Sequence, residues 1–184
     1  MIIKPVDDHN DLFEIQNFYP EELVEKFLAT DHLQQPYKKE AWQDDWPRRR
    51  IVHDLDPVYN ELDSYVKSQI SVISNIVNTD IDNCDTGFWL DEAGFRMRPH
   101  VDNAIVKISM QIYLNDNDIT LGTVFYDNTL SVRYRPLYKI NWGYLMINGP
   151  KQLHGMMNLV PQDTYRIRSE EHTSELQSRL HLVC

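Results

Sequence analysis

The sequence predicts a mainly β domain, a small antiparallel barrel or jelly roll, with α-helices covering it. The first observation is residues 105–114, where side chains alternate between two faces, as they do along a β-strand. A polar face enclosed by a barrel suits ligand binding, while the apolar face packs against helices. A half-exposed strand with its polar face in water is the alternative. The apolar face comprises Val106, Ile108, Met110, Ile112 and Leu114, and the opposite face Ile105, Lys107, Ser109, Gln111 and Tyr113.

The second observation is two helical patterns that would cover this barrel. Residues 20–28 begin with Pro20 and two glutamates, and their apolar side chains lie on one side of a helix. A longer helix is predicted from about Asp56 to Asn78, with Pro57 in its first turn. Residues 12–18 alternate enough to predict a strand before the first helix. The stripe of the longer helix, which we expect to pack in the core, comprises Val58, Leu62, Tyr65, Val66, Ile73, Ile76 and Val77.

The third observation is a set of residues suited to binding a metal ion. In a strand, residues i and i+2 point to the same side, so His100 and Asp102 can bind one ion while Val101 packs away from it. The third ligand must come from a strand distant in sequence, and His154 ends a segment of suitable character, residues 144–154. Two imidazoles and one carboxylate leave three positions on an iron ion open for co-substrate and dioxygen. This ligand set predicts oxygenase chemistry.

The His-x-Asp pattern is weak by itself, because it also occurs at His9 and Asp11. That copy lies in a polar run, residues 7–11, where a solvated loop is the natural interpretation. For His100 and Asp102 the alternative is a hydrogen-bonded histidine beside an aspartate in a turn.

Arg166 adds a candidate carboxylate-binding group. An arginine fork binds a carboxylate through two parallel hydrogen bonds, a geometry that lysine cannot reproduce. Arg166 follows His154 by twelve residues, in the next hydrophobic segment. A carboxylate held there could reach the metal with its other end. An exposed arginine on a surface strand is the alternative.

A family resemblance rests on residues 88–103, on Tyr113-Leu114-Asn115, on residues 122–126, and on His154 and Arg166. Over roughly residues 85–167 the chain resembles the 2-oxoglutarate and Fe(II)-dependent dioxygenases, most closely their prolyl-hydroxylase-like branch. The resemblance implies a double-stranded β-helix, a jelly-roll or cupin-like barrel, with His100, Asp102 and His154 as iron ligands. It also implies that Arg166 pairs with the distal carboxylate of 2-oxoglutarate and that Tyr113 hydrogen-bonds to the same end. The alternative for Tyr113 is an aromatic that fills the barrel core through its ring.

The resemblance implies an enzyme that uses Fe(II), 2-oxoglutarate and dioxygen to hydroxylate an unactivated C–H bond, with release of succinate and carbon dioxide. The protein then supplies orientation and excludes water. A small molecule or a peptide is the expected substrate: peptidyl proline is the family-level expectation, and free amino acids stay open. Two alternatives are a non-catalytic metal- or ligand-binding barrel and a structural interaction protein.

The segment after Ile167 departs from the family pattern, which has a small hydroxyl residue two positions after the arginine where this chain has Arg168. Residues 168–184 resemble an in-frame translation of a sequencing adapter. We therefore predict one domain over residues 1–167, mostly helical cover to residue 84 and barrel core from 85 to 167, truncated at its C-terminus. The tail, 168–184, is then non-native and makes few buried contacts. An amphipathic helix with Leu176, Leu180 and Val183 on one side is the alternative.

Charge and cysteine content favour an intracellular protein. The formal net charge of the chain is −10, and −9 without the two arginines and three glutamates of the tail. Cys84 is then the one cysteine left, so no intrachain disulfide is possible and a reducing compartment is expected. No apolar stretch approaches the roughly 20 residues of a membrane span, and residues 1–5 lack a signal-peptide pattern. We predict a cytoplasmic protein; the oligomeric state stays open.

A run of aromatic and charged residues, Trp42 to Arg50, is the remaining candidate for a function. Basic and aromatic side chains together can bind nucleic acid. Three arginines beside two aspartates in an acidic chain make a weak electrostatic footprint. We therefore expect a lid or structural loop and no nucleic-acid partner.

Overall fold

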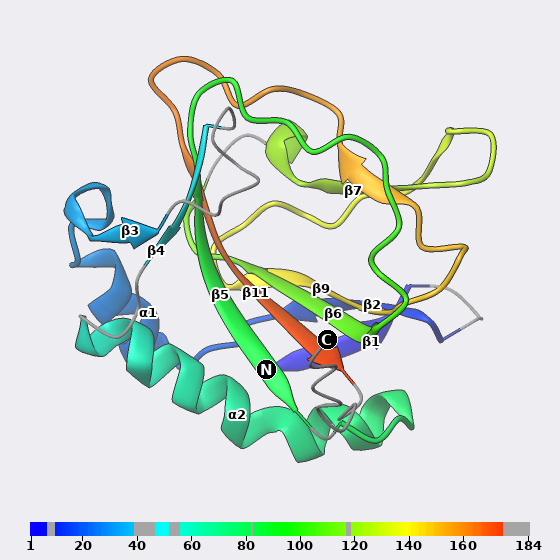
Figure 1. Cartoon of the computed structure of the whole chain (residues 1–184). Helices are drawn as coiled ribbons and strands as arrows, with labels where there is room; N and C mark the ends of the chain where they lie inside the picture. The colour runs from blue at the N-terminus through cyan, green and yellow to red at the C-terminus, as the bar shows by residue number, and fades with distance from the viewer. Residues whose placement is uncertain (7–9, 39–46, 52–55, 82, 117–118, 175–184) are drawn as a thin grey trace, which may run out of the picture.

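The computed structural model describes residues 1–6, 10–38, 47–51, 56–81, 83–116 and 119–174. A large antiparallel sheet has helices on one face and a smaller antiparallel sheet opposite the other (Figure 1). The helices are α1 (Glu21–Leu28) and α2 (Pro57–Val77), with 3₁₀ turns at His32–Gln34 and Ile119–Leu121. The order in the large sheet is β1 (Ile2–Pro5), β2 (Leu12–Gln16), β9 (Trp142–Ile147), β6 (Val106–Tyr113), β11 (Arg166–Ser174), β5 (Cys84–Asp91), β4 (Arg48–Ile51) and β3 (Tyr37–Lys38). The order in the small sheet is β10 (His154–Met156), β7 (Thr123–Tyr126) and β8 (Val132–Tyr134).

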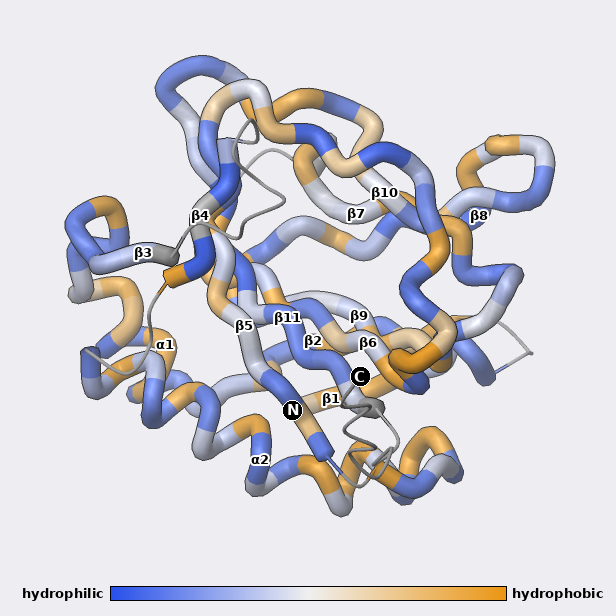
Figure 2. Tube along the Cα trace, viewed as in Figure 1, coloured by the Kyte–Doolittle hydropathy of each residue, from blue (hydrophilic) through white to orange (hydrophobic). Residues whose placement is uncertain are grey.

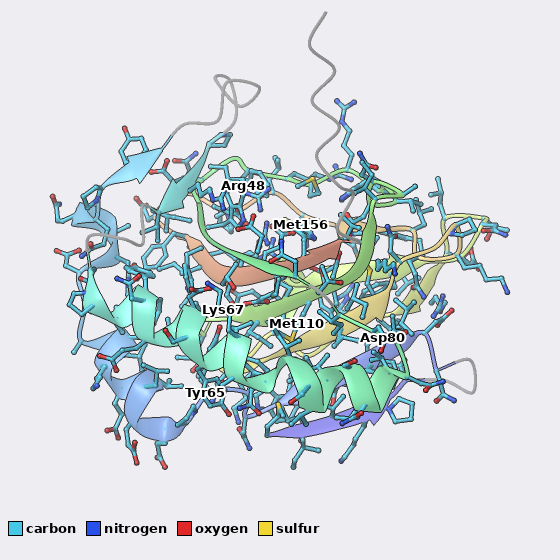
Figure 3. The ribbon with its side chains drawn as sticks, turned by 60° about the horizontal axis from the view of Figure 1, so that its bottom comes forward. Arg48, Tyr65, Lys67, Asp80, Met110 and Met156 are labelled. Carbon is cyan, nitrogen blue, oxygen red and sulfur yellow. The ribbon has the colours of Figure 1, made fainter. Side chains whose placement is uncertain are left out.

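Helix α2 begins and ends close to where the sequence predicts. The Asp56 side chain accepts a hydrogen bond of 2.9 Å from the Val58 N–H, which satisfies one of the free donors of the first turn. Asn78 ends the helix in the left-handed conformation, with φ 50°. In Figure 3 the helix crosses in front of the large sheet, where Met110 of β6 lies behind it. The buried side chains of α2 are Val58, Tyr59, Leu62, Val66, Ile73 and Val77, whereas Ile76 of the predicted stripe is exposed.

Strand β6 has the two faces that its alternation predicts. Its apolar face packs in the main core beneath the helices. The side chains on the opposite face point between the two sheets, and Ser109, Gln111 and Tyr113 are 4%, 3% and 0% exposed. An ordinary half-exposed strand is therefore excluded, because the polar face is enclosed.

The first 84 residues supply strands as well as the helical cover. Strands β1 and β2 extend one edge of the large sheet, and β4 and β3 extend the other. The prediction of a loop at the end of the Trp42–Arg50 run is wrong for residues 48–50, because β4 pairs antiparallel with β5. The partner strand is distant in sequence, so the local pattern could not reveal this pairing. Residues 42–46 lie outside the described part of the chain.

Strand β11 contradicts the expectation that residues after Ile167 make few buried contacts. It lies in the middle of the large sheet and pairs with β5 on one side and β6 on the other. Figure 2 shows it as a hydrophilic strand between its neighbours. The pairing is made by backbone N–H and C=O groups, which charged residues carry as well as apolar ones. Residues 175–184, with the alternative helix, lie outside the described part.

Two smaller expectations concern cysteine chemistry and membranes. Cys84 is free and buried, and burial raises the pKa of its thiol to about 12. This thiol is therefore protonated at neutral pH and is no nucleophile. Neither α1 nor α2 has the length and apolar character needed to cross a membrane.

Candidate metal centre and co-substrate pocket

His100, Asp102 and His154 come together between the two sheets. The Asp102 Oδ1 atom lies 3.6 Å from His100 Nε2 and 3.7 Å from His154 Nε2. The possible ligand atoms of the three residues all lie within 4.8 Å of one another. Two ligand atoms that each lie about 2.0–2.2 Å from one ion, at right angles, are about 3 Å from each other. The three side chains would therefore have to move only slightly closer together to bind a metal ion.

The backbone holds the two histidines next to each other. His100 and His154 form an isolated antiparallel bridge, in which each N–H donates to the other residue's carbonyl at 2.9 Å. Their Nδ1 atoms lie 2.9 Å from the carbonyl oxygens of Arg98 and Gln152, respectively. If each Nδ1–H donates to its carbonyl, each Nε2 keeps a free lone pair toward Asp102, which is the tautomer a metal ligand needs.

Gly155 permits the close approach of these segments. A Cβ atom at this position would lie 2.9 Å from the carbonyl oxygen of Met97, from the carbonyl carbon of Arg98 and from the nitrogen of Pro99. All three are backbone atoms, so they have no side-chain freedom to move aside. A residue with a side chain here would push β10 away from the segment that carries His100.

The surroundings of the three side chains favour metal binding over other uses. Ser109 of β6 donates a hydrogen bond of 2.6 Å to Asp102 Oδ2, which leaves Oδ1 to face the histidines. Burial lowers the pKa of His154, whereas hydrogen bonding to Asp102 raises the pKa of His100. Burial works to raise the pKa of Asp102, but contacts with both histidines and Ser109 outweigh it and lower the pKa. Two imidazole nitrogens and an ionised carboxylate fit a divalent ion such as Fe(II).

Arg166 points into the same interior but has a partner that the sequence did not predict. Its guanidinium lies 3.3 Å from the buried carboxylate of Asp91. Arg48 and Arg168 contact the same carboxylate at 3.0 and 3.4 Å. Glu170 adds a second carboxylate, 2.7 Å from Arg168 and 3.4 Å from Arg48. Three guanidiniums against two carboxylates leave one excess positive charge.

Part of Arg166 remains available to an anion. Its Nη1 donates to the sulfur of Met156 at 2.9 Å and its Nη2 to the hydroxyl of Thr123 at 3.4 Å. Its Nε is buried and has no hydrogen-bond partner in the described residues. A buried donor without an acceptor costs free energy, so this atom fits a carboxylate ligand.

Tyr113 lies near Arg166, and its geometry favours the packing alternative. The Arg166 guanidinium is 5.7 Å from the centre of the Tyr113 ring, and that ring stacks on Tyr138 at 4.2 Å. The Tyr113 hydroxyl accepts a hydrogen bond of 2.9 Å from the Thr123 N–H. Binding of a co-substrate by this hydroxyl stays a prediction.

One narrow cavity is lined by His100, His154 and Arg166. Gln111, Thr123 and Tyr144 line its wall, and the side chains of Arg168 and Glu170 also face it. The centre of a water molecule can occupy about 20 Å³ of it, which is room for about one water. Arg166 and Thr123 thus offer groups that suit the carboxylate of 2-oxoglutarate, but the open volume of the cavity is smaller than this molecule.

A larger recess lies next to Asp102. It offers about 290 Å³ to the centre of a water molecule, and Glu170 lines both this recess and the narrow cavity. Trp89 forms part of its wall, with the Arg48 guanidinium 4.1 Å from the ring centre. A substrate has room here to approach the metal site.

Sequence reasoning named the three candidate ligands that the structure brings together, and it missed their surroundings. Gln111 was placed correctly on the enclosed face of its strand, but Asp91, Arg48 and Glu170 gave no recognisable pattern. Their contacts join residues as far apart as 48 and 170, and no local spacing records such contacts. The second His-x-Asp copy is not tested, because His9 lies outside the described residues.

Solved structures with the same architecture include prolyl hydroxylases. A prolyl hydroxylase from Trichoplax adhaerens, in complex with a hypoxia inducible factor peptide fragment, superposes with a TM-score of 0.69 at 16% identity, covering 90% of this chain and 84% of that one. A Pseudomonas putida prolyl-4-hydroxylase gives 0.67 at 13% identity, covering 89% and 92%. HygX from Streptomyces hygroscopicus, with nickel and 2-oxoglutarate bound, gives 0.61 at 11% identity, covering 89% and 82%.

These similarities concern structure only. No protein-family model matches the chain, and no curated protein matches it either. At such identities the likeness shows the fold, which is the double-stranded β-helix of the 2-oxoglutarate oxygenases. The predicted fold class is confirmed.

Proposed function

We propose that the chain is an Fe(II)- and 2-oxoglutarate-dependent oxygenase that hydroxylates an unactivated C–H bond. The observation that carries the proposal is the convergence of His100, Asp102 and His154, together with a cavity that the two histidines share with Arg166. Metal-binding residues and a buried arginine in one enclosed space match a metal with a carboxylate co-substrate.

Some residues of the site would bind the metal ion, and others border the space for the substrate. His100, Asp102 and His154 would hold the ion on one face, and Ser109 fixes the orientation of the carboxylate. A bound ferrous ion would supply the activation of dioxygen. The His154 side chain is buried between the sheets, whereas His100 is partly exposed. The recess beside Asp102 leaves the open side of the site to a substrate.

A small molecule or a peptide is the proposed substrate class. One structural neighbour was solved with a peptide fragment bound, and the recess beside Asp102 has space for a side chain of a peptide. Hydroxylation of a peptidyl-prolyl or amino-acid substrate is the specific form of the proposal that we favour.

The alternative is a metal-binding barrel without turnover. The small open volume beside Arg166 favours it, because Arg168 and Glu170 occupy space that a co-substrate needs. In this alternative the three ligands bind a divalent ion and the cluster around Asp91 is structural.

The two functions differ in what happens to 2-oxoglutarate. The protein is loaded with Fe(II) without oxygen, 2-oxoglutarate is added, and succinate is measured after admission of air and a panel of prolyl peptides and free amino acids. We expect succinate from the chain and none from Asp102→Ala, while Glu22→Ala, an exposed change on α1, behaves like the parent. Metal binding without any succinate, at any concentration of 2-oxoglutarate, would favour the non-catalytic barrel.

A further inference from the structure

We infer that the side chains of Arg168 and Glu170 close the co-substrate pocket, and that small residues at both positions open it. The inference rests on the proposed function and names the residues that limit access of 2-oxoglutarate to its site. Both side chains belong to β11, the strand that also carries Arg166.

The alternation of β11 directs these side chains inward. Residues i and i+2 share a face of a strand, so Arg166, Arg168 and Glu170 all point between the two sheets. Arg168 and Glu170 line the narrow cavity together with Arg166 and the two histidines. Ser169, in contrast, lies on the other face, where the Tyr19 hydroxyl contacts it at 3.1 Å.

The two side chains are held in place by other charges. Arg168 is 2% exposed and contacts both Glu170, at 2.7 Å, and Asp91, at 3.4 Å. Arg48 contacts the same two carboxylates from β4, at 3.4 and 3.0 Å. Moving Arg168 or Glu170 out of the cavity would separate buried opposite charges, which is strongly unfavourable. The closed arrangement is therefore the stable one.

In the closed arrangement the remaining space is smaller than the co-substrate, so 2-oxoglutarate binds weakly and only when these side chains move aside. Room for about one water molecule does not accommodate a five-carbon dicarboxylate. The anchoring groups are nevertheless present, since Arg166 Nε lacks an acceptor and the Thr123 hydroxyl lies beside the same guanidinium. The obstruction thus comes from volume and not from missing binding groups.

Removing both side chains preserves the charge balance. Arg168 and Glu170 carry opposite charges, so their joint replacement leaves Arg48 and Arg166 against Asp91, again with one excess positive charge. A single replacement would change this excess. The double variant therefore tests volume while keeping the attraction for an anion.

The experiment compares the chain with three double variants and one single variant. Arg168→Ser with Glu170→Thr removes volume and keeps residues suited to a strand, and Arg168→Ala with Glu170→Ala is a second version of the same change. Arg168→Met with Glu170→Gln removes both charges but retains the size of the side chains. Ser169→Ala, on the opposite face of β11, is the matched control. Circular dichroism and binding of Mn(II) first verify that each protein is folded and has its metal site.

The measurement is the affinity for 2-oxoglutarate of the Mn(II)-loaded proteins, by isothermal titration calorimetry. We expect the small double variants to bind at least about tenfold more tightly than the parent, and the size-retaining variant and Ser169→Ala to bind like the parent. Equal, measurable affinity in all proteins would overturn the inference and leave the proposed function standing. No binding to any folded, Mn(II)-loaded protein would overturn the inference and the proposed co-substrate together.

Discussion

At the scale of single residues, the hydroxyl of Ser109 decides which oxygen of Asp102 faces the histidines. It donates to Oδ2 at 2.6 Å and is itself 4% exposed. Ser109→Ala should weaken binding of Co(II) about 10- to 100-fold, because the carboxylate loses the partner that orients it. Titration of the visible Co(II) spectrum measures this. Ser169→Ala, another buried serine outside the metal site, should bind Co(II) like the parent, and an equal loss in both variants would contradict a specific role for Ser109.

Gly155 provides a second prediction for the metal centre. Gly155→Ala places a methyl group 2.9 Å from backbone atoms of residues 97–99, so β10 and that segment must separate. We expect the distance between His100 and His154 to grow and metal affinity to fall at least about tenfold. Gly149→Ala is the control, since nothing lies within 4 Å of a Cβ there. Unchanged Co(II) affinity in Gly155→Ala would show that the segments move together without cost to the site.

The proximity of the candidate ligands His100 and Asp102 was predictable from the sequence because their spacing has a local cause. His100 and Asp102 are two residues apart, and their pattern needs only the geometry of an extended chain. The charged groups around Arg166 were not predictable, because Asp91 and Arg48 reach it from other strands. Contacts of this kind depend on the pairing of the whole sheet.

At the scale of elements, β11 changes character after Ile167. Its inner face continues with charged residues, and its outer face brings Glu171 into the apolar core beneath α2. Neither carboxylate oxygen of Glu171 accepts a hydrogen bond in the described residues. Buried ionisable side chains on both faces are unusual in a central strand, which agrees with a foreign origin of residues 168–184. That origin stays a prediction, and the gene sequence beyond codon 167 tests it.

Glu171 should make the stability of the chain depend on pH. Burial is the largest cause and raises the pKa of Glu171 to about 8, although the nearby hydroxyl groups of Ser169 and Tyr19 act to lower it. The folded state therefore holds a proton that the unfolded state, with its ordinary pKa near 4.5, has released. The contribution of this bound proton to the free energy of unfolding is complete below about pH 4.5. It decreases by about 1.4 kcal/mol per pH unit as the pH rises, and it is lost above about pH 8.

Glu171→Leu removes this dependence. We expect a gain of a few kcal/mol in the free energy of unfolding at pH 8, and a much smaller gain at pH 5. Urea denaturation at the two pH values measures the difference. Glu171→Gln, which removes the charge but keeps a buried polar group, should gain less at pH 8. A gain from Glu171→Leu that is the same at both pH values would mean that the carboxyl group titrates normally.

Helix α2 offers a prediction about its N-terminus. Asp56→Ala removes the acceptor for the Val58 N–H and should lower the free energy of unfolding by about 1 kcal/mol. The shift of the urea midpoint measures it. Asp31→Ala removes the corresponding cap of a single 3₁₀ turn and should cost less; a larger loss there would contradict the importance of α2 for stability.

At the scale of the whole molecule, the order of strands makes β11 indispensable. It lies between β5 and β6, so its removal separates the sheet into two parts. Deletion of residues 168–184 should abolish cooperative thermal unfolding, measured by circular dichroism. Truncation after Ser174 keeps all of β11 and is the control. A deletion variant that still unfolds cooperatively at the parent's temperature would show that the remaining strands close the sheet.

The core of this architecture could be predicted from the sequence, but the strands at the edges of the large sheet could not. The alternation of β6 and the stripes of α1 and α2 predicted a barrel covered by helices, because one face of each must be buried. The double-stranded β-helix itself was implied by the family resemblance. The edges were missed: β1 has no clear alternation, and β4 is a run of arginines. Such strands are extended because a neighbouring strand pairs with their backbone, and the sequence alone contains no record of that neighbour.

The antiparallel bridge between His100 and His154 has a thermodynamic consequence. Its two backbone hydrogen bonds form when the barrel folds, so the entropy lost in arranging these ligands is lost during folding and not during capture of an ion. Pre-organisation of this kind raises affinity without any additional contact. An ion that binds only the folded state raises the free energy of unfolding. A divalent ion should therefore act as a cross-link that slows opening of the barrel mouth, and the strands around it should exchange their amide hydrogens more slowly when the ion is present.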